Sequence, residues 1–576
     1  MKAELILKNA QLFTFDEMYR GADALAVSDG KILKIGSEAD MLPLTGPETR
    51  VLDCGGKTVL PGLCDAHCHG SMSANMFGAC QLFDIDTAEG ETGDDEVDKI
   101  VAALQAFDAA HPADIIRGIG WNQAHFDGSG VHPKRTLSRH DLDRVSRDRP
   151  VVLESYCQHA LWTNTKALEL AGLTADTPQP PFGYYETEAD GYPSGVFHDA
   201  EAIAYIKEGM PGYDYTVEEY KKTIGQYLST CVTNYGVTLI QEAKLSENAI
   251  RAYAELAAED ALPARIRAVY CVDHPCEARE EQTVLARRNE HTENELFQIN
   301  TVKYFLEGMF VMLEPYSHEY CQAQGKPDDY CGELFFDDET LTRSFETMMQ
   351  AGYQIHIHAM GDAAVHQAVH CLKNAQDHTG TKNRNVIAHV MCIPEEDKQV
   401  MGQAELVASI QPRWGVVDVD VHDGYMYLLG KERAERVFPD RSLSDAGCVV
   451  AYGTDFPVTP PPNPFHGICC ALRREDIPCG RDYERVKGLQ LGPDGDPSAD
   501  VVSLTDAVRR SSLNGAYQMF LEQVTGELAE GRSAELVLLD CDLTAIPETE
   551  IYAVTVERTF FRGREVYTKA DAKGAL

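Results

Sequence analysis

Both ends of the chain carry short runs of apolar residues, in places alternating with polar ones, that have the length and composition of β-strands. Turn residues such as Asp29-Gly30 separate the runs near the start of the chain. The predicted strands lie at residues 5–7, 11–15, 24–27 and 31–35, and again at 534–540 and 553–567, where the pattern includes a hairpin. We therefore expect a composite β-sandwich domain that both termini build together.

The middle of the chain has a different rhythm, in which short apolar or β-branched runs alternate with segments of helical periodicity. The runs lie at residues 237–240, 266–270, 301–305, 354–358, 385–389, 406–410 and 449–453, and helical patterns include 218–235, 250–259 and 340–350. A further strand, which begins with the apolar run at 58–63, brings the number to eight. This alternation predicts an α/β fold with a parallel sheet, and eight strands are the number that closes a (β/α)8 TIM barrel.

One long segment interrupts this rhythm. Residues of about 75–215 are rich in Gly, Pro and Asp, and we interpret them as a subdomain inserted after the first barrel strand. An insertion of this length has to fold over something, and the barrel mouth is adjacent. The predicted organisation is a first sandwich part at 1–58, the barrel with its insertion at 59–524, and a second sandwich part at 525–576.

The composition excludes some classes of partner and predicts the cellular compartment. The 576 residues include 51 basic and 91 acidic side chains, and the resulting net charge of −40 repels nucleic acid and anionic membranes, so we exclude both as partners. We see no run that is typical of a signal peptide or a membrane span. The 17 cysteines follow no framework spacing and include no C-x-x-C pair. These features predict a reduced, cytoplasmic protein.

Two histidines, His67 and His69, are the most informative polar residues, and they follow the first apolar run of the barrel. Side chains two residues apart in a strand point to the same side, so both imidazoles and Asp65 project together. That arrangement is half of a site for a transition metal. The spacing alone is weak evidence, because 19 histidines produce some H-x-H pairs by chance, and His356 and His358 form a second one.

Further potential ligands fall in or at the ends of other predicted barrel strands, where barrel enzymes place their chemistry. Lys303 lies in the fourth strand, His358 ends the fifth, His389 ends the sixth and Asp455 ends the eighth. Each of these residues has a structural explanation on its own, as a core, rim or turn residue. Together with the histidine pair they predict one metal site.

The residues around these positions resemble the amidohydrolase superfamily, and within it amidohydrolase family 3, the branch of YtcJ-like proteins and N-substituted formamide deformylases. The resemblance runs nearly end to end. Its motifs lie at residues 60–69, 120–122, 158–164, 358–364, 411–412, 453–458 and 526–537. Three positions depart from the branch: Glu307 stands in place of an Asp, Asn122 in place of an acid, and Glu535 in place of an Asp.

The resemblance implies one or two divalent metal ions, zinc above all. The implied ligands are His67, His69, His358 and His389, with Asp455 beside them, and Lys303 matches a lysine that is carboxylated and bridges two metals in many relatives. A free ammonium has no lone pair, whereas a carbamate offers two oxygens. The implied reaction is hydrolysis by metal-activated water, in which Asp455 transfers the proton, and the metal or a nearby histidine such as His389 stabilises the oxyanion.

The preferred substrate is a small N-substituted amide, cleaved at a C–N bond that is not a peptide bond. Residues that either line a concave pocket or pack the insertion onto the barrel are Trp121, Tyr156, His159, Trp414 and Tyr304. Deamination of a ring, or opening of a cyclic amide or lactone, would use the same scaffold. A catalytically silent binding or scaffold paralogue is the remaining alternative. A homodimer is expected only by analogy with such barrels.

Overall fold

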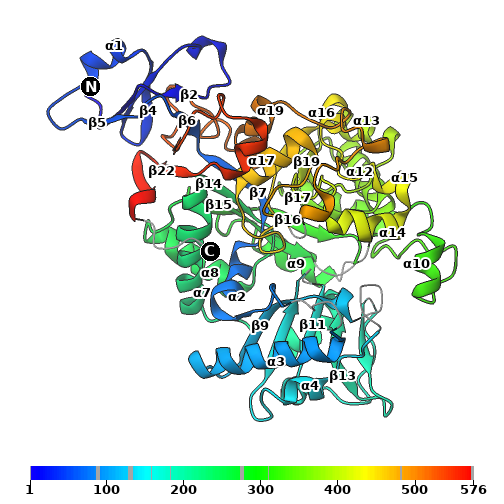
Figure 1. The fold of residues 1–576 in the computed structure, drawn as a ribbon. Helices are drawn as coiled ribbons and strands as arrows, with labels where there is room; N and C mark the ends of the chain where they lie inside the picture. The colour runs from blue at the N-terminus through cyan, green and yellow to red at the C-terminus, as the bar shows by residue number, and fades with distance from the viewer. Residues whose placement is uncertain are drawn as a thin grey trace. The chain divides into compact units, whose positions relative to one another are not determined.

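The computed structural model describes residues 2–85, 91–126, 134–156, 159–181, 183–272, 278–308, 310–480 and 483–571. The chain divides into two compact units, each described here by itself (Figure 1). The first comprises Met1–His69, Gly225–Leu245 and Ala254–Leu576, and the second comprises Gly70–Ile224 and Ser246–Tyr253. None of the helices in these described ranges is long and apolar enough to cross a membrane.

A sheet of eight parallel strands forms the core of the first unit. In sheet order the strands are β7 (Leu63–Cys68), β14 (Val237–Glu242), β15 (Arg265–Val272), β16 (Phe297–Phe305), β17 (Gln354–Ala359), β18 (Val386–His389), β19 (Val407–Ile410) and β20 (Val449–Tyr452). Sheet order equals chain order, as in a TIM barrel. Most residues of these strands are buried, which explains their continuous apolar runs. The predicted barrel is confirmed.

The first and last strands, β7 and β20, meet where the barrel closes. After β20, the backbone N–H of Asp455 donates to the carbonyl of His67 at 2.8 Å, and the N–H of His69 donates to the carbonyl of Phe456 at 2.7 Å. Gly453 packs directly on this seam, because a Cβ added there would lie 2.6 Å from the nitrogen of His67. Barrel closure therefore brings two motifs together that are almost 400 residues apart in the sequence.

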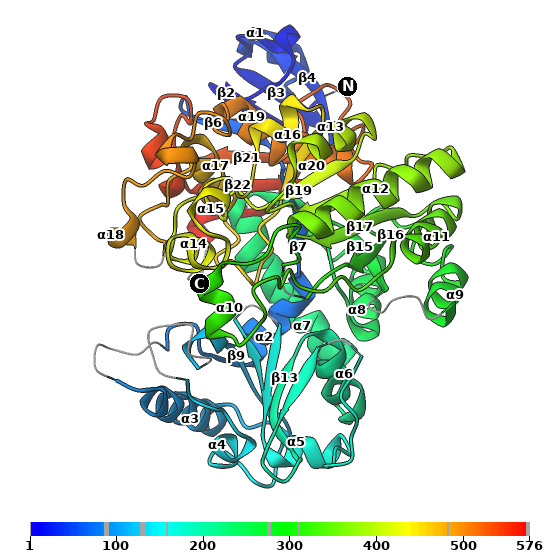
Figure 2. The same ribbon diagram turned by 90° about the vertical axis from the view of Figure 1, so that its right-hand side faces the viewer.

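Helices lie outside the barrel strands, and Figure 2 shows α11 (Asp338–Gln350) and α12 (Asp362–Thr379) beside β15 to β17, with α13 (Glu395–Gln403) next to α12. The helical pattern at 340–350 corresponds to α11, and the pattern at 250–259 corresponds to α8 (Glu247–Ala258). The pattern at 218–235 is α7 (Val217–Tyr227) followed by a π turn and a 3-10 turn.

Two further sheets of the first unit form the sandwich. One has the order β4-β3-β1-β5 and the other β2-β6-β21-β22-β23. The strands are β1 (Leu5–Lys8), β2 (Gln11–Leu12), β3 (Ala24–Ser28), β4 (Lys31–Gly36), β5 (Arg50–Asp53), β6 (Thr58–Pro61), β21 (Leu536–Leu539), β22 (Val556–Phe561) and β23 (Arg564–Thr568). Leu7 and Val27 of one sheet share a buried core with Leu536 and Phe560 of the other. The composite sandwich is confirmed.

The chain passes from the sandwich into the barrel at Gly62, between β6 and β7. A Cβ at this position would lie 2.1 Å from Oγ1 of Thr238 and 2.9 Å from Cβ of Glu535, so only glycine allows the approach. The apolar run at 58–63 is thus divided between two sheets, and strand pairing favours a boundary at Gly62. The predicted domain boundaries 1–58, 59–524 and 525–576, with the insertion at 75–215, stay predictions.

The second unit is built on a mixed six-stranded sheet with the order β12-β13-β11-β10-β9-β8. Its strands are β8 (Cys80–Gln81), β9 (Ile116–Trp121), β10 (Val151–Ser155), β11 (Ala160–Thr163), β12 (Tyr184–Thr187) and β13 (Pro193–His198). Alternation along the strands sends Leu153 and Trp162 into a core with α3 (Gly93–Ala110). It sends Val152 and Leu161 into another core with α5 (Thr165–Leu170) and α6 (Ala200–Gly209).

Candidate metal centre

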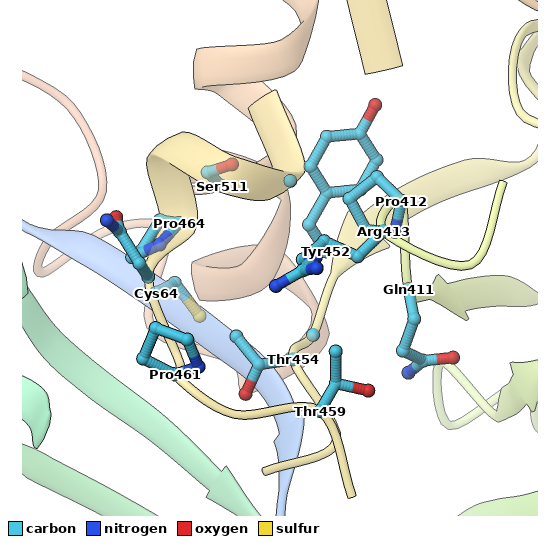
Figure 3. Close-up of a pocket in the computed structure, with 13 residues that line it drawn as sticks. Cys64, Gln411, Pro412, Arg413, Tyr452, Thr454, Thr459, Pro461, Pro464 and Ser511 are labelled. Atoms are coloured by element: carbon cyan, nitrogen blue, oxygen red, sulfur yellow. The ribbon is translucent and has the colours of Figure 1, made fainter. Parts of the chain in front are cut away.

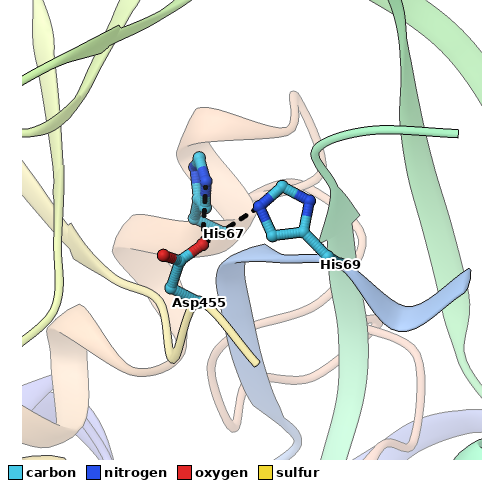
Figure 4. Close-up of side chains that lie close together, drawn as sticks. All are labelled: His67, His69 and Asp455. Atoms are coloured by element: carbon cyan, nitrogen blue, oxygen red, sulfur yellow. Dashed lines mark ion pairs between the residues drawn. The ribbon is translucent and has the colours of Figure 1, made fainter. Parts of the chain in front are cut away.

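His67 and His69 point at the carboxylate of Asp455 across the barrel seam (Figure 4). Oδ1 of Asp455 lies 3.3 Å from Nε2 of His67 and 3.1 Å from Nε2 of His69. One ligand atom from each of the three side chains lies within 4.8 Å of the others. A cation with metal–ligand distances of about 2 Å can contact donors at these spacings simultaneously.

The hydrogen bonding and the charge of Asp455 show whether a cation fits between these three side chains. Its Oδ1 is buried and accepts no hydrogen bond of acceptable geometry within the described part of the chain, although leaving a buried oxygen unpaired is unfavourable. Burial raises the pKa of Asp455, but the imidazoles of His67 and His69 lower it more, and its pKa lies well below the ordinary value. A buried, ionised oxygen that faces two imidazole nitrogens fits a divalent metal ion.

In His67 and His389 the second ring nitrogen has a hydrogen-bond partner, which leaves Nε2 for a metal. Nδ1 of His67 lies 2.8 Å from Nε2 of His356, and Nδ1 of His389 lies 2.9 Å from Oε1 of Gln411. With a cation bound, Nδ1–H would donate in both cases and Nε2 would offer its lone pair. Burial lowers the pKa of His67 well below its usual value and that of His389 to about 4, so both rings are neutral ligands at neutral pH.

The remaining predicted ligands lie in the same cluster. Nζ of the fully buried Lys303 is 3.4 Å from Nε2 of His67. The ring of His389 is 4.8 Å from that of His67 and 4.6 Å from that of His358, measured between centroids. The structure therefore brings together all six residues that the sequence nominated as metal ligands. Their role as ligands stays a prediction.

Two of these residues have an unusual backbone conformation. His389 has φ of +76° and Asp455 has φ of +56°, in the left-handed region that residues other than glycine rarely adopt. Each such residue costs about 1–3 kcal/mol and persists only where surrounding contacts hold it. His389 is the last residue of β18 and Asp455 lies three residues after the end of β20, so both conformations occur where the chain turns away from the barrel strands.

Glu307, which departs from the family pattern, is a buried anchor beside the centre. Its carboxylate accepts backbone N–H groups from Val311 at 2.6 Å and Gly361 at 3.1 Å, and a third from Met360. Burial outweighs these bonds and raises the pKa of Glu307 to about 8. Glu307 ties the segment after β16 to the turn after β17, close in sequence to His358.

Sequence reasoning did not give His356, Gln411 or Asp65 a role in supporting the ligands, and it placed Asp65 beside the histidine pair. His356 was visible as part of the second H-x-H pair, and the two-residue strand period places it on the same face as His358. Gln411 belongs to a motif that was recognised without a role. Asp65 accepts the backbone N–H of Thr454 at 2.9 Å and its hydroxyl at 2.5 Å, which fixes the segment before Asp455.

Of the residues nominated for substrate binding, Trp414 lies beside the cluster. Its ring stacks on His389 with centroids 5.4 Å apart, and its indole N–H donates to the hydroxyl of Thr459. Tyr304 is fully buried, packs edge to face on Phe345 of α11 and shares a hydrogen bond with Ser344. Because Tyr304 lies on the opposite face of β16 from Lys303, it fills the layer between strand and helix and does not line a pocket.

The other three nominated residues, Trp121, Tyr156 and His159, belong to the second unit. Trp121 is buried in that unit's own core, where its indole N–H donates to the carbonyl of Leu153 at 3.1 Å. Nδ1 of His159 lies 3.1 Å from Asp199, and the ring of Tyr156 is half-buried. Trp121 therefore packs within its own unit, which is neither of the two roles that the sequence left open, pocket lining or packing of the insertion onto the barrel. Binding roles for the three residues stay predictions.

A cavity of about 30 Å³ lies near the ends of β19 and β20 (Figure 3). Gln411 and Pro412 line one side, Gly453 and Thr454 another, and Pro464 closes it at the start of α17 (Pro464–Arg473). This volume holds about one water molecule and no substrate. The cavity is therefore too small to serve as a substrate-binding pocket.

A closed parallel barrel with imidazoles, a lysine and a carboxylate gathered at its strand ends defines a class of barrel hydrolase. The chain belongs to the Amidohydrolase family, whose sequence profile matches residues 50–567. It is similar to the putative amidohydrolase YtcJ of Bacillus subtilis, with 26% identity over 97% of this chain and 98% of that protein. It is also similar to the N-substituted formamide deformylase of Arthrobacter pascens, with 24% identity over 97% of each chain.

The fold matches a solved structure over nearly its whole length. An uncharacterized metal-dependent hydrolase from Pyrococcus horikoshii superposes with a TM-score of 0.71 at 21% identity, over 94% of this chain and 99% of that one. The chain is therefore a hydrolase of the amidohydrolase family with that family's barrel and sandwich.

Proposed function

We propose that this protein is a metal-dependent hydrolase that cleaves the amide-type C–N bond of a small N-substituted amide. The observation that carries the proposal is the ionised, buried Oδ1 of Asp455, which lies 3.3 and 3.1 Å from the Nε2 atoms of His67 and His69. The similarity to the N-substituted formamide deformylase of Arthrobacter pascens, over the full length of both chains, supports the choice of substrate class.

Imidazole nitrogens and a carboxylate oxygen are donors that suit zinc. The residues that would hold it are His67, His69, His358, His389, Lys303 and Asp455. A bound divalent ion would supply Lewis acidity, which makes water nucleophilic near neutral pH. We also expect Lys303 to be carboxylated, since an unmodified ammonium 3.4 Å from Nε2 of His67 would repel the same cation.

Asp455 carries the proton in the proposed reaction. Its depressed pKa keeps it ionised, so it can accept the proton of the attacking water and pass it to the leaving nitrogen. This transfer is needed because an amine is a poor leaving group unless it is protonated. The neutral ring of His389 is fixed by Gln411 and stacked on Trp414, so its Nε2 would be held in place as a ligand for the cation.

The test is a substrate panel on zinc-loaded protein, with N-substituted formamides, N-acyl amines, N-acyl amino acids, carbamates, cyclic amides and aminated heterocycles. Amine and carboxylic acid released in equal amounts from a linear amide would support the proposal, and His67→Asn and Asp455→Asn should both lose this activity. Intact mass under bicarbonate should show one added CO2 that Lys303→Met lacks.

Other outcomes would redirect the assignment. Release of ammonia from a ring would identify a deaminase, and ring opening without a free amine would identify a cyclic amide or lactone hydrolase. A protein that neither retains zinc nor turns over any compound of the panel would be a silent paralogue. Each of these results would overturn the proposed reaction.

A further inference from the structure

A second group of metal-type ligands lies among the outer helices of the first unit and shares no residue with the centre described above. His366 and His370 are one turn apart on α12, and Asp397 is in the first turn of α13. Nδ1 of His366 lies 2.8 Å from Oδ2 of Asp397, and Nε2 of His370 lies 2.9 Å from its Oδ1. One ligand atom from each residue lies within 4.8 Å of the others.

The surroundings of Asp397 are unusual for a carboxylate. Its side chain is only 1% exposed, whereas the side chains of His366 and His370 are 47% and 43% exposed. In the described part of the chain no lysine or arginine forms an ion pair with Asp397. The two imidazoles and the amino end of α13 are the groups that face this carboxylate in the described part of the chain.

We propose that these three residues form a peripheral site for a divalent transition-metal cation, with Zn²⁺ as the natural ion. Two histidines spaced i, i+4 on one helix present nitrogens on one face, and a carboxylate from the facing helix completes three protein ligands. The exposed side of both rings leaves the remaining coordination positions to water. The net charge of −40 attracts cations to the surface.

Such an ion would link the two helices that follow the strands of the centre. Helix α12 begins three residues after β17, which carries His358, and α13 follows β18, which ends at His389. A cation held by both helices would therefore fix α12 and α13 to each other on the outside of the barrel. These helices follow β17 and β18, whose C-terminal ends carry the predicted ligands His358 and His389. This role is independent of the proposed reaction, and its test needs no substrate.

The alternative is that the imidazoles only donate hydrogen bonds to Asp397, and two substitutions separate the explanations. The amide of Asn matches the position of Nδ1, and that of Gln matches Nε2. His366→Asn and His370→Gln therefore keep an N–H donor to Asp397 while removing a nitrogen ligand. His378→Ala is the matched control, because His378 is an exposed histidine on the same helix that pairs with Glu346.

Zinc is titrated by calorimetry into protein whose centre has first been loaded with zinc, for the wild type and the three variants. We expect the wild type and His378→Ala to bind one further equivalent, and His366→Asn and His370→Gln to bind it at least tenfold more weakly. Added zinc should slow hydrogen exchange in the first turn of α13 in the wild type and in His378→Ala, but not in the other two variants. No further equivalent in the wild type, or equal affinity in all four proteins, would overturn the proposal.

Discussion

Replacing Gly453 by alanine should separate the two strands that close the barrel. The added Cβ would lie 2.6 Å from the backbone nitrogen of His67 and 2.8 Å from its carbonyl oxygen, whereas ordinary contacts begin at 3.4 Å. The third close neighbour is Cβ of His67, at 2.7 Å, which is attached directly to the backbone. No flexible side chain can therefore rotate away to relieve the contacts. Relief requires β7 and β20 to move apart by about 0.8 Å, the difference between 3.4 and 2.6 Å.

This displacement sets the expected magnitude. Overpacking of this kind costs about 1–3 kcal/mol. The bond from the N–H of Asp455 to the carbonyl of His67 would lengthen from 2.8 Å to about 3.6 Å and be lost, which adds about 1 kcal/mol. Metal ligands must lie within about 0.2 Å of their positions, so affinity for zinc should fall at least tenfold.

The assay compares melting temperature and zinc affinity in the wild type, Gly453→Ala and Gly225→Ala. The control places the same methyl group on helix α7, where no atom lies within 4 Å, and should raise stability by about 0.5–1 kcal/mol. Gly453→Ala should melt several degrees lower and lose zinc. If it melts like the wild type and holds zinc within twofold of the wild-type affinity, then β7 and β20 do not pack as described at this seam.

Three further substitutions test the centre and its surroundings. Asp455→Asn, which keeps the shape and tolerates the left-handed φ, should lower turnover at least 10³-fold with unchanged circular dichroism, and a near-normal rate would exclude its proton-transfer role. His356→Leu removes the acceptor for Nδ1–H of His67 and should weaken zinc binding about 10–100-fold, whereas His356→Gln supplies an amide oxygen and should retain most of it; equal affinities would refute this support. Burial lowers the pKa of His466 to about 4, with Arg413 contributing. The contribution of neutral, buried His466 to the free energy of unfolding is therefore complete above pH 6.5. It falls as the pH drops toward 4, by about 2.5 kcal/mol at pH 4.5. His466→Gln should lose that component of the melting-temperature difference between pH 7 and pH 4.5, and an unchanged difference would contradict it.

The fold was predictable because the two kinds of sheet leave different patterns in the sequence. Barrel strands are buried on both faces and give continuous apolar runs between helical patterns, whereas the sandwich strands follow one another without helices of this length, and some, such as β4, alternate between buried and exposed residues. The transition at Gly62 was not predictable, because β6 and β7 read as one apolar run. Only the close approach of Thr238 and Glu535 divides that run, and both come from distant parts of the chain.

The ligands were predictable from their places at the ends of barrel strands, but their supporting contacts were not. His356 supports His67 from a position 289 residues away in the sequence, and which of two histidines in β17 does so depends on the register of the closed barrel. The sequence also did not predict that Trp121 is buried in the core of its own unit. An aromatic residue beside a family motif looks the same whether it faces a pocket or, as here, its own unit's core.

Among the two residues of the centre with a left-handed backbone, His389 and Asp455, it is Asp455 whose conformation depends on closure of the barrel. Neither residue type favours positive φ strongly enough to adopt it without surrounding support. Asp455 is held by the bond from its N–H to the carbonyl of His67, and the turn after His389 by the N–H of Val390, which donates to the carbonyl of Ala359. The first bond joins β7 and β20, which are neighbours only in the closed barrel, whereas the second joins β17 and β18, which pair directly within the sheet. A change that opens the seam therefore releases the strained conformation and the metal ligands together, so stability and zinc affinity should fall in the same variants.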